Sequence, residues 1–171
     1  MTIPDSGKVT ASAIQNQSFA NLYNLINSRS NVPDPADSTG VRKFVYVRLP
    51  NIGRGNVGFP FIVVHRIKPS KSKNVVSATK SFMSYDMIIA VYSQDAASDG
   101  IGNPNGAEQC NEITDNIQKT LNNATNRKAL INQGMAHLEY DIDISEESYN
   151  GRTVFVSELD IRFESTLLLT T

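Results

Sequence analysis

Hydrophobic periodicity along the chain predicts two amphipathic helices. Apolar residues recur every three or four positions over 11–28 and again over 107–122, the spacing of a helix with one buried side. Acidic residues in the first half of the 107–122 helix suit the positive end of the helix dipole. A shorter helical segment is predicted over 126–133, ending at Gly134 because glycine readily closes a helix.

A period of two marks the other ordered segments, which we predict to be strands. The expected strands are 41–49, 59–67, a long strand or a bent pair of strands over 75–92, 136–144, and a last strand that contains Phe155 to Leu167. Polar, glycine- or proline-containing segments between them are predicted to be loops and turns at 28–40, 50–58, 68–73, 93–106 and 145–152. The Asn-Gly pair in the last of these is typical of a hairpin.

The resulting order, α-β-β-β-α-β-β, predicts the fold class. Strands that follow one another, with helices inserted rather than alternating, indicate an α+β protein with a mostly antiparallel sheet and helices packed on one face. The 171 residues correspond to a single domain spanning 1–171, with long loops at 28–40, 50–58 and 93–106.

Composition excludes several kinds of protein and site. Sixteen basic and seventeen acidic residues leave a net charge of -1, unlike a dedicated nucleic-acid binder. One cysteine and two histidines rule out a disulfide framework and a cysteine- or histidine-rich metal centre. No apolar segment is long enough to span a membrane, and the first residues lack the apolar core of a secretory signal. We therefore expect a soluble intracellular protein with no membrane partner.

Candidate catalytic and cofactor motifs fail on their context. Residues 53–58 match the G-x-G-x-x-G pattern of a dinucleotide site, but a strand-like segment follows where such a site needs a helix. Cys110 falls in register with the apolar side of its helix, so we interpret it as a buried hydrophobic residue. Glu108 and Glu112 fit a solvated helix face better than a metal site. We expect no catalytic residue, cofactor or metal.

Charge is divided unequally between the two halves of the chain. Nine basic residues and no acid lie between Arg42 and Lys80, whereas eight acids accompany only Arg152 and Arg162 between Gly134 and Glu164. Each run can be the solvated side of its strands. Alternatively, the two runs form a self-complementary surface, on which identical subunits pack head to tail and close into a ring.

Four segments carry a further pattern in addition to the order of the elements: ATKSFMSYDMIIAVYSQD, AEQCNEITDNIQKTL, GMAHLEYDIDIS and TVFVSELDIRFEST. With that order they resemble the tail-terminator (tail-completion, neck) proteins of long-tailed bacteriophages and related viruses, and the resemblance covers most of residues 11–168. This chain departs from the compact members of the family in its longer loops at 28–40, 50–58 and 93–106. The similarity is one of architecture, since the family has no catalytic motif to match.

The resemblance implies a structural virion protein and no enzyme. Such proteins form a hexameric ring on the head-proximal end of the tail tube, stop its polymerisation and contact the neck. The implied partners are further copies of the chain, the tail tube protein and a neck or head-completion protein, and DNA passes through without specific binding. The implied location is the tail or neck of the virion, and the host cytoplasm during assembly.

We expect two surfaces to carry this role. The acidic strand faces are predicted to line the lumen, where negative charge lets DNA slide; their residues are Glu139, Asp141, Asp143, Glu158, Asp160 and Glu164. Loops 50–58 and 68–74 are predicted to contact the tube or neck through Arg54, Lys68, Lys71 and Lys73. The alternatives are another neck component, such as an adaptor or head-closure protein, and a small α+β enzyme or ligand-binding module, which a pocket with converging polar groups favours.

Overall fold

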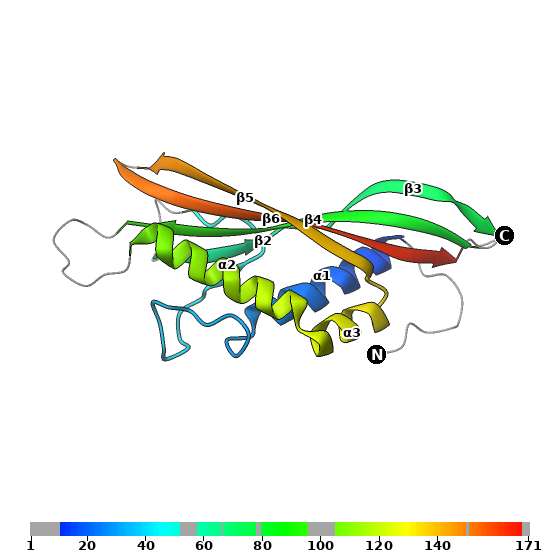
Figure 1. Cartoon of the computed structure of the whole chain (residues 1–171), viewed down its shortest axis with the longest axis horizontal. Coiled ribbons are helices and arrows are strands. Elements are labelled where there is room, and N and C mark those ends of the chain that lie inside the picture. The colour runs from blue at the N-terminus through cyan, green and yellow to red at the C-terminus, as the bar shows by residue number, and fades with distance from the viewer. Residues whose placement is uncertain are drawn as a thin grey trace.

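The computed structural model describes residues 11–51, 58–65, 67–77, 80–95, 105–149 and 151–168. The elements in chain order are α1 (Ala11–Asn27), β1 (Val45–Tyr46), β2 (Phe61–Val64), β3 (Lys68–Ser77), β4 (Lys80–Gln94), α2 (Gly106–Asn122), α3 (Ala124–Asn132), β5 (Ala136–Tyr149) and β6 (Arg152–Leu168). The predicted α+β class is confirmed. Figure 1 shows an elongated molecule in which the long strands cross above α1, α2 and α3.

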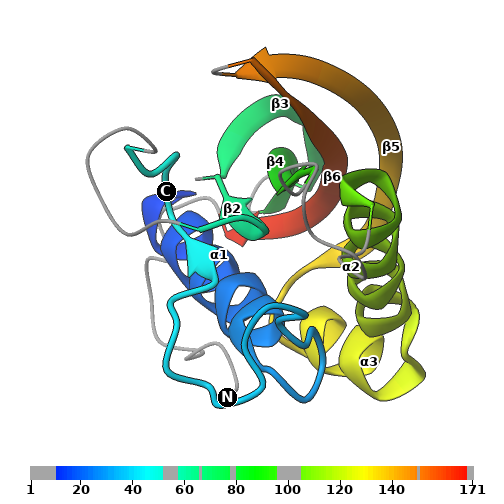
Figure 2. The ribbon, with the colours of Figure 1, turned by 90° about the vertical axis from the view of Figure 1, so that its left-hand side faces the viewer.

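The strands form one mostly antiparallel sheet. Its order is β1-β2-β4-β6-β5, with β3 paired to the first half of β4, and only β1 and β2 are parallel. β4 and β6 pair along 15 residues of β4, and β5 pairs with β6 from Ala136 to Tyr149. Figure 2 shows how strongly these strands curl around one another, as expected for long twisted strands.

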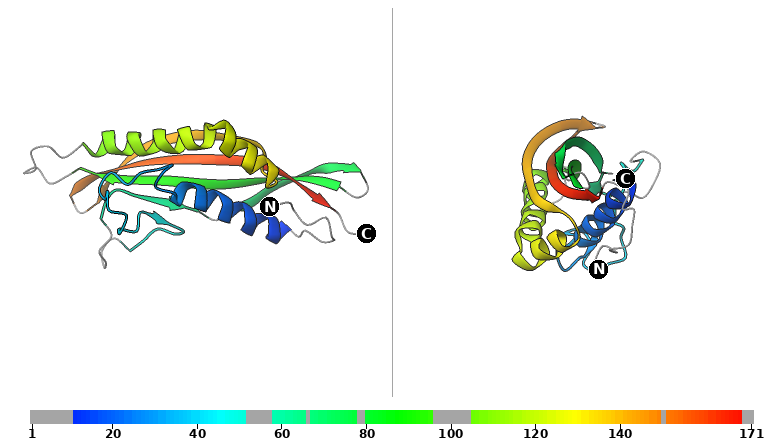
Figure 3. Two further views of the ribbon diagram at one scale, coloured as in Figure 1. Left: turned by 90° about the horizontal axis from the view of Figure 1, so that it is seen from below. Right: turned by 90° about the vertical axis from the view of Figure 1, so that its right-hand side faces the viewer.

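The main core lies between α2 and one face of the sheet, which we call the helix face. Register places Tyr85, Met87 and Ile89 of β4 on it, opposite Phe163, Ile161 and Leu159 of β6, and all six residues are buried. Helix α2 covers this face with its predicted apolar side, which consists of Cys110, Ile113, Ile117 and Leu121. Figure 3 shows α2 running along the long strands. Packing of all three helices on a single face stays a prediction.

Helix α2 begins where β4 ends, at a very close approach of the two elements. The Asn105 side chain accepts a hydrogen bond from the Ala107 N–H at 2.9 Å, and the Gly106 N–H donates to Asp95 Oδ1 at 2.9 Å. A Cβ at Gly106 would lie 2.7 Å from the Asp95 nitrogen and from the Gln94 carbonyl carbon. Only glycine therefore allows the helix to start so near the strand.

The predicted 28–40 loop is confirmed and is tied down by polar contacts. Arg29 donates to the backbone carbonyls of Asp37 and Arg42, both at 2.6 Å. The Thr39 hydroxyl and the Arg42 N–H donate to the Asp37 carboxylate and hold its pKa well below the usual range of aspartate. The stabilisation from this carboxylate is present above the pKa of an unfolded aspartate and is lost as the pH falls through the lower folded value.

Several expectations about the strands and the segments between them are wrong. The predicted turn at 68–73 belongs to β3, because a strand at the edge of a sheet tolerates its lysines and serines. The 75–92 segment is a pair of strands, the end of β3 followed by β4, and with α3 counted the order is α-β-β-β-β-α-α-β-β. The predicted 145–152 loop is mostly strand, since β5 continues to Tyr149 and β6 begins at Arg152. The 41–49 and 59–67 strands are much shorter. At the predicted 93–106 loop, β4 extends to Gln94 and α2 begins at Gly106, and residues 96–104 lie outside the described residues. The central part of the 50–58 loop lies outside the described residues.

The hydroxyl of Tyr85 is buried in the core without a hydrogen-bond partner among the described residues. Its ring stacks on Phe163 with the centroids 5.2 Å apart, and burial raises the pKa of the phenol. We expect Tyr85→Phe to raise the free energy of unfolding by about 1 kcal/mol, because an unsatisfied buried hydroxyl is removed and the ring is kept. Urea denaturation measures the change. A loss of stability of similar size would show that the hydroxyl is hydrogen bonded in solution.

Candidate functional site

The second face of the sheet, which we call the groove face, carries most of the charged residues of the long strands. Register places Glu139 opposite Arg162, Asp141 opposite Asp160, and Asp143 opposite Glu158. Glu164 follows on the same face, opposite Ser84 of β4. The six acids that the sequence predicted as lumen-lining therefore share one face of the sheet, although they come from two strands.

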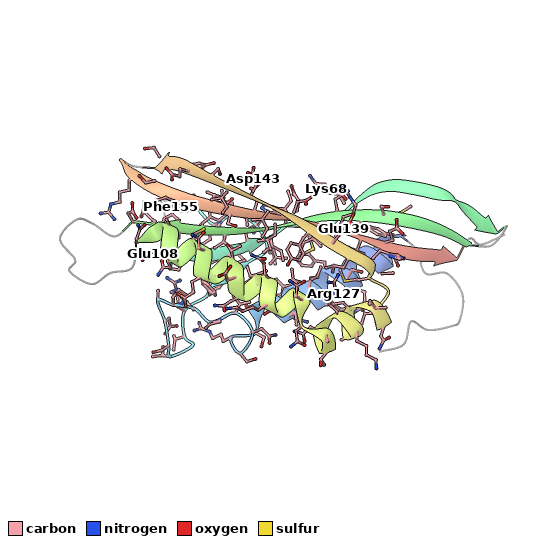
Figure 4. All side chains as sticks on the ribbon, in the orientation of Figure 1. Lys68, Glu108, Arg127, Glu139, Asp143 and Phe155 are labelled. Carbon is pink, nitrogen blue, oxygen red and sulfur yellow. The ribbon has the colours of Figure 1, made fainter. Side chains whose placement is uncertain are left out.

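The curl of the sheet leaves a cavity of about 980 Å³ on the groove face. The acids Asp86, Glu139, Asp141 and Asp160 line it from β4, β5 and β6. The basic residues Arg48, His65, Lys68 and Arg162 also line it. Figure 4 shows Lys68 and Glu139 near the middle of the molecule and Asp143 farther along β5. Acidic and basic groups that the sequence assigned to separate surfaces thus meet in one groove.

Arg162 links the acids at the centre of this groove. Its Nε lies 3.3 Å from Asp86 Oδ1 on β4, and its Nη1 lies 3.8 Å from Glu139 Oε1 on β5. All three side chains are substantially exposed, so these ion pairs contribute little stability. Their effect is to neutralise part of the charge at this end of the groove.

Beyond Arg162, the charges of neighbouring strands repel one another. Asp141 faces Asp160 and Asp143 faces Glu158, and like charges directly opposite on antiparallel strands are unfavourable. Within the part of the chain that the structure describes, none of these four carboxylates forms an ion pair. We call Asp141, Asp143, Glu158 and Asp160 the acidic strip.

The hydroxyl of Tyr92 reports the negative potential around the acidic strip. Tyr92 lies on β4 on the groove face, two residues along from Ala90, which pairs with Glu158. Burial raises the pKa of Tyr92, and the negative charges of Glu158 and Glu147 raise it further. The negative charges of Glu158, which belongs to the strip, and of Glu147 therefore add to burial in disfavouring the Tyr92 phenolate.

The structure describes only part of the basic residues that the sequence predicted to contact the tube or neck. Arg54 lies outside the described residues, and the structure describes only the backbone of Lys71 and Lys73, which pair with Ser84 and Phe82 of β4. Lys68 is exposed and lies in β3 instead of a loop. Arg42, which the sequence placed in the basic run, is engaged inside the chain: it forms an ion pair with Asp34 and donates to the carbonyls of residues 58–60.

Sequence reasoning missed the contribution of several groove residues. His65 falls within the predicted 59–67 strand, but β2 ends at Val64 and the half-buried imidazole lines the cavity. Arg162 follows Glu158 and Asp160 at a spacing of two, so the sequence pattern places it on this face, but the pattern does not indicate its ion pairs with Asp86 and Glu139. No signal in the sequence identified Asp86, because its ion pair with Arg162 joins residues that are 76 positions apart.

The catalytic and metal-binding candidates of the sequence can be judged among the described residues. Cys110 is buried, as predicted, and burial raises the pKa of its thiol to about 11, so it stays protonated and weakly nucleophilic at neutral pH. Among the described residues, no group of three or more His, Cys, Asp or Glu side chains is placed to hold a metal ion. The helices in the described part of the chain also include none that could cross a lipid bilayer.

Comparison with known proteins leaves the site to be interpreted from its own geometry. The chain matched no model of a known protein family and no curated protein sequence.

Proposed function

We propose that this chain is a structural virion protein that forms a ring, a hexamer in the family it resembles, at the head-proximal end of a phage tail tube. There it ends tube polymerisation and joins the tail to the neck. Its partners are copies of itself, the tail tube protein and a neck protein. It acts in the virion after assembly in the host cytoplasm, without enzymatic activity, cofactor or membrane partner.

The acidic strip is the single observation that supports this proposal most. Four carboxylates face one another across β5 and β6, and none of them forms an ion pair within the described part of the chain, which costs folding stability. Such repulsion is useful on a surface past which DNA moves, because negative side chains repel the DNA phosphates and prevent binding. In a ring, the acidic strips of successive subunits line the lumen.

Light scattering and electron microscopy test ring formation and its place on the tube. The purified protein is expected to form a closed oligomer near six subunits, loosened by high salt because exposed charge pairs are screened. Added to the tail tube protein of the same virus while it polymerises, it should shorten the tubes and leave an extra ring at one end. Unchanged tube length with a bound-ring frequency no higher than on untreated tubes would contradict the proposal.

A charge-reversal pair tests the lumen assignment. Asp141→Lys combined with Asp160→Lys should make the ring retain linear double-stranded DNA in a filter assay, with retention falling steeply as salt rises. The matched control, Glu108→Lys with Glu112→Lys, introduces the same charge on the exposed side of α2 and should leave the ring unable to retain DNA. Equal retention by both variants would show that the acidic strip does not face the passage.

The groove cavity supports a second candidate function, a module that binds a small ligand. Arg48, His65 and Lys68 converge on a cavity of about 980 Å³ with Asp86 and Glu139, as expected for a polar, zwitterionic molecule. Native mass spectrometry of the freshly purified protein tests this function. A stoichiometric small molecule that Glu139→Gln weakens would favour binding over the ring, and a mass equal to that of the bare chain would exclude a tightly carried ligand.

A further inference from the structure

The outer edge of β5 has no neighbouring strand among the described residues. β5 is the last strand of the sheet and pairs only with β6. It is 14 residues long, and all residues from 141 to 148 are exposed. A long unpaired strand edge presents N–H and C=O groups that another chain can complete, and monomeric proteins usually protect such edges.

Two partly exposed isoleucines give this edge an apolar surface on which another chain can pack. Ile142 and Ile144 lie on the helix face of β5 and are 38% and 59% exposed. Single exposed apolar side chains are common on protein surfaces. Two of them on the same face of an unpaired strand, however, form a continuous apolar contact for an incoming chain.

The opposite edge of the sheet has matching properties. In the described part of the chain β1 pairs only with β2. The Tyr23 hydroxyl donates to the Val45 carbonyl at 3.4 Å, so the part of this edge without a described partner follows Val45. Val47 and Leu49, which follow directly, are 42% and 53% exposed. Both edges therefore present two partly exposed aliphatic residues.

The two edges carry opposite charge. β5 contains five acids and no lysine or arginine. The 41–51 segment contains three basic residues and no acid. Of these three, Arg42 is bound to Asp34, which leaves the exposed Lys43 and Arg48. Two β5 edges repel each other, whereas a β5 edge and a 43–49 edge attract.

We propose that the outer edge of β5 in one subunit binds residues 43–49 of the next copy of this chain. Ile142 and Ile144 then contact Val47 and Leu49. Two acids of β5 outside the acidic strip, Glu146 and Glu147, face Lys43 and Arg48. Because the two edges lie at opposite ends of the strand order, the contact is head to tail, and it repeats until the ring closes. This inference rests on the proposed ring and identifies its subunit interface.

Two charge-reversal variants test this interface by light scattering. Glu146→Lys with Glu147→Lys reverses the β5 edge, and Lys43→Glu with Arg48→Glu reverses the 43–49 edge. Each variant alone should lose the oligomer, with a rise of about a hundredfold or more in the apparent dissociation constant, since like charges meet at every contact. An equimolar mixture should recover it, because alternating subunits restore opposite charges at each contact.

A control variant, circular dichroism and hydrogen exchange distinguish loss of the interface from loss of the fold. Glu108→Lys with Glu112→Lys changes α2 by the same charge and should assemble like the unmodified chain. All six substituted side chains of the two test pairs and the control pair are exposed, and circular dichroism should confirm an unchanged fold. Hydrogen exchange at β5 amides should slow in the oligomer and remain fast in either variant alone.

Three results would overturn the inference. These are an unmodified chain that stays monomeric at its solubility limit, a 43–49 variant that assembles normally, and a mixture that stays dissociated. Normal assembly of both variants together with tube capping would reject this interface and keep the proposed function. Charge-sensitive rings that never cap tubes would keep the interface and reject the proposed function.

Discussion

Replacing Arg42 by alanine is expected to lower the free energy of unfolding by about 3–5 kcal/mol, as found when a buried ion pair loses one partner. The Arg42 guanidinium binds both carboxylate oxygens of Asp34, with Nε–Oδ2 at 2.9 Å and Nη2–Oδ1 at 3.1 Å. The Asp34 side chain is 0% exposed, so its charge would be left without a counterion. Urea denaturation followed by circular dichroism measures the loss.

The effect of Arg42→Ala extends beyond the ion pair. Arg42 also donates to the carbonyls of Gly58, Phe59 and Pro60, and so ties the 28–42 segment to the start of β2. Arg42→Lys keeps the charge but not the planar fork, and should recover only part of the stability. A loss below about 1 kcal/mol for Arg42→Ala, the value of an exposed pair, would show that water reaches Asp34 in solution.

Replacing Phe163 by alanine should cost a similar amount, about 3–5 kcal/mol, because it opens a large cavity in the core. The Phe163 side chain is fully buried on the helix face and stacks on Tyr85 with an interplanar angle of 16°. Phe163→Leu retains most of the volume and should cost less than about 1.5 kcal/mol. Thermal and urea denaturation of both variants measure the two losses in the free energy of unfolding, and the loss for Phe163→Ala should be the larger.

The two Phe163 variants also test whether the stacking between β4 and β6 holds these strands in register. Leu22 and Ile26 of α1 belong to the same buried cluster as Phe163. If Phe163→Ala and Phe163→Leu lost equally little stability, the cluster would be loosely packed, and the stacking between β4 and β6 would not hold the two strands in register.

Local pattern was a good guide to the helices and to the class of the fold. The 107–122 helix is found one residue from its predicted start, since its apolar side alternates at the helical period along its whole length. The predicted 126–133 helix is confirmed as α3, and Asn123 caps it through the Thr125 and Asn126 amides. Each helical hydrogen bond joins residues four positions apart, so the sequence pattern that predicts a helix lies within the helix itself.

Strand boundaries were harder to predict, because a strand is completed by a partner far away in the sequence. Lysines and serines made 68–73 look like a turn, yet the β4 edge supplies its hydrogen bonds. Apolar and polar residues alternate over 41–49, as in a strand. Arg42, however, forms an ion pair with Asp34, and the Tyr23 hydroxyl donates to the Val45 carbonyl, so only two residues form strand. Neither competing contact is visible in local periodicity.

The sequence by itself determined which residues alternate on each strand, and so which acids stand on the polar side of β5 and of β6. Only the tertiary structure decided that these two polar sides are the same face, that Asp141 meets Asp160, and that Lys68 shares their groove. Alternation is a property of one strand, whereas register is set by pairing and by burial of the opposite face. The physical reason is that charges interact through space, and the chain must fold before distant charges are neighbours.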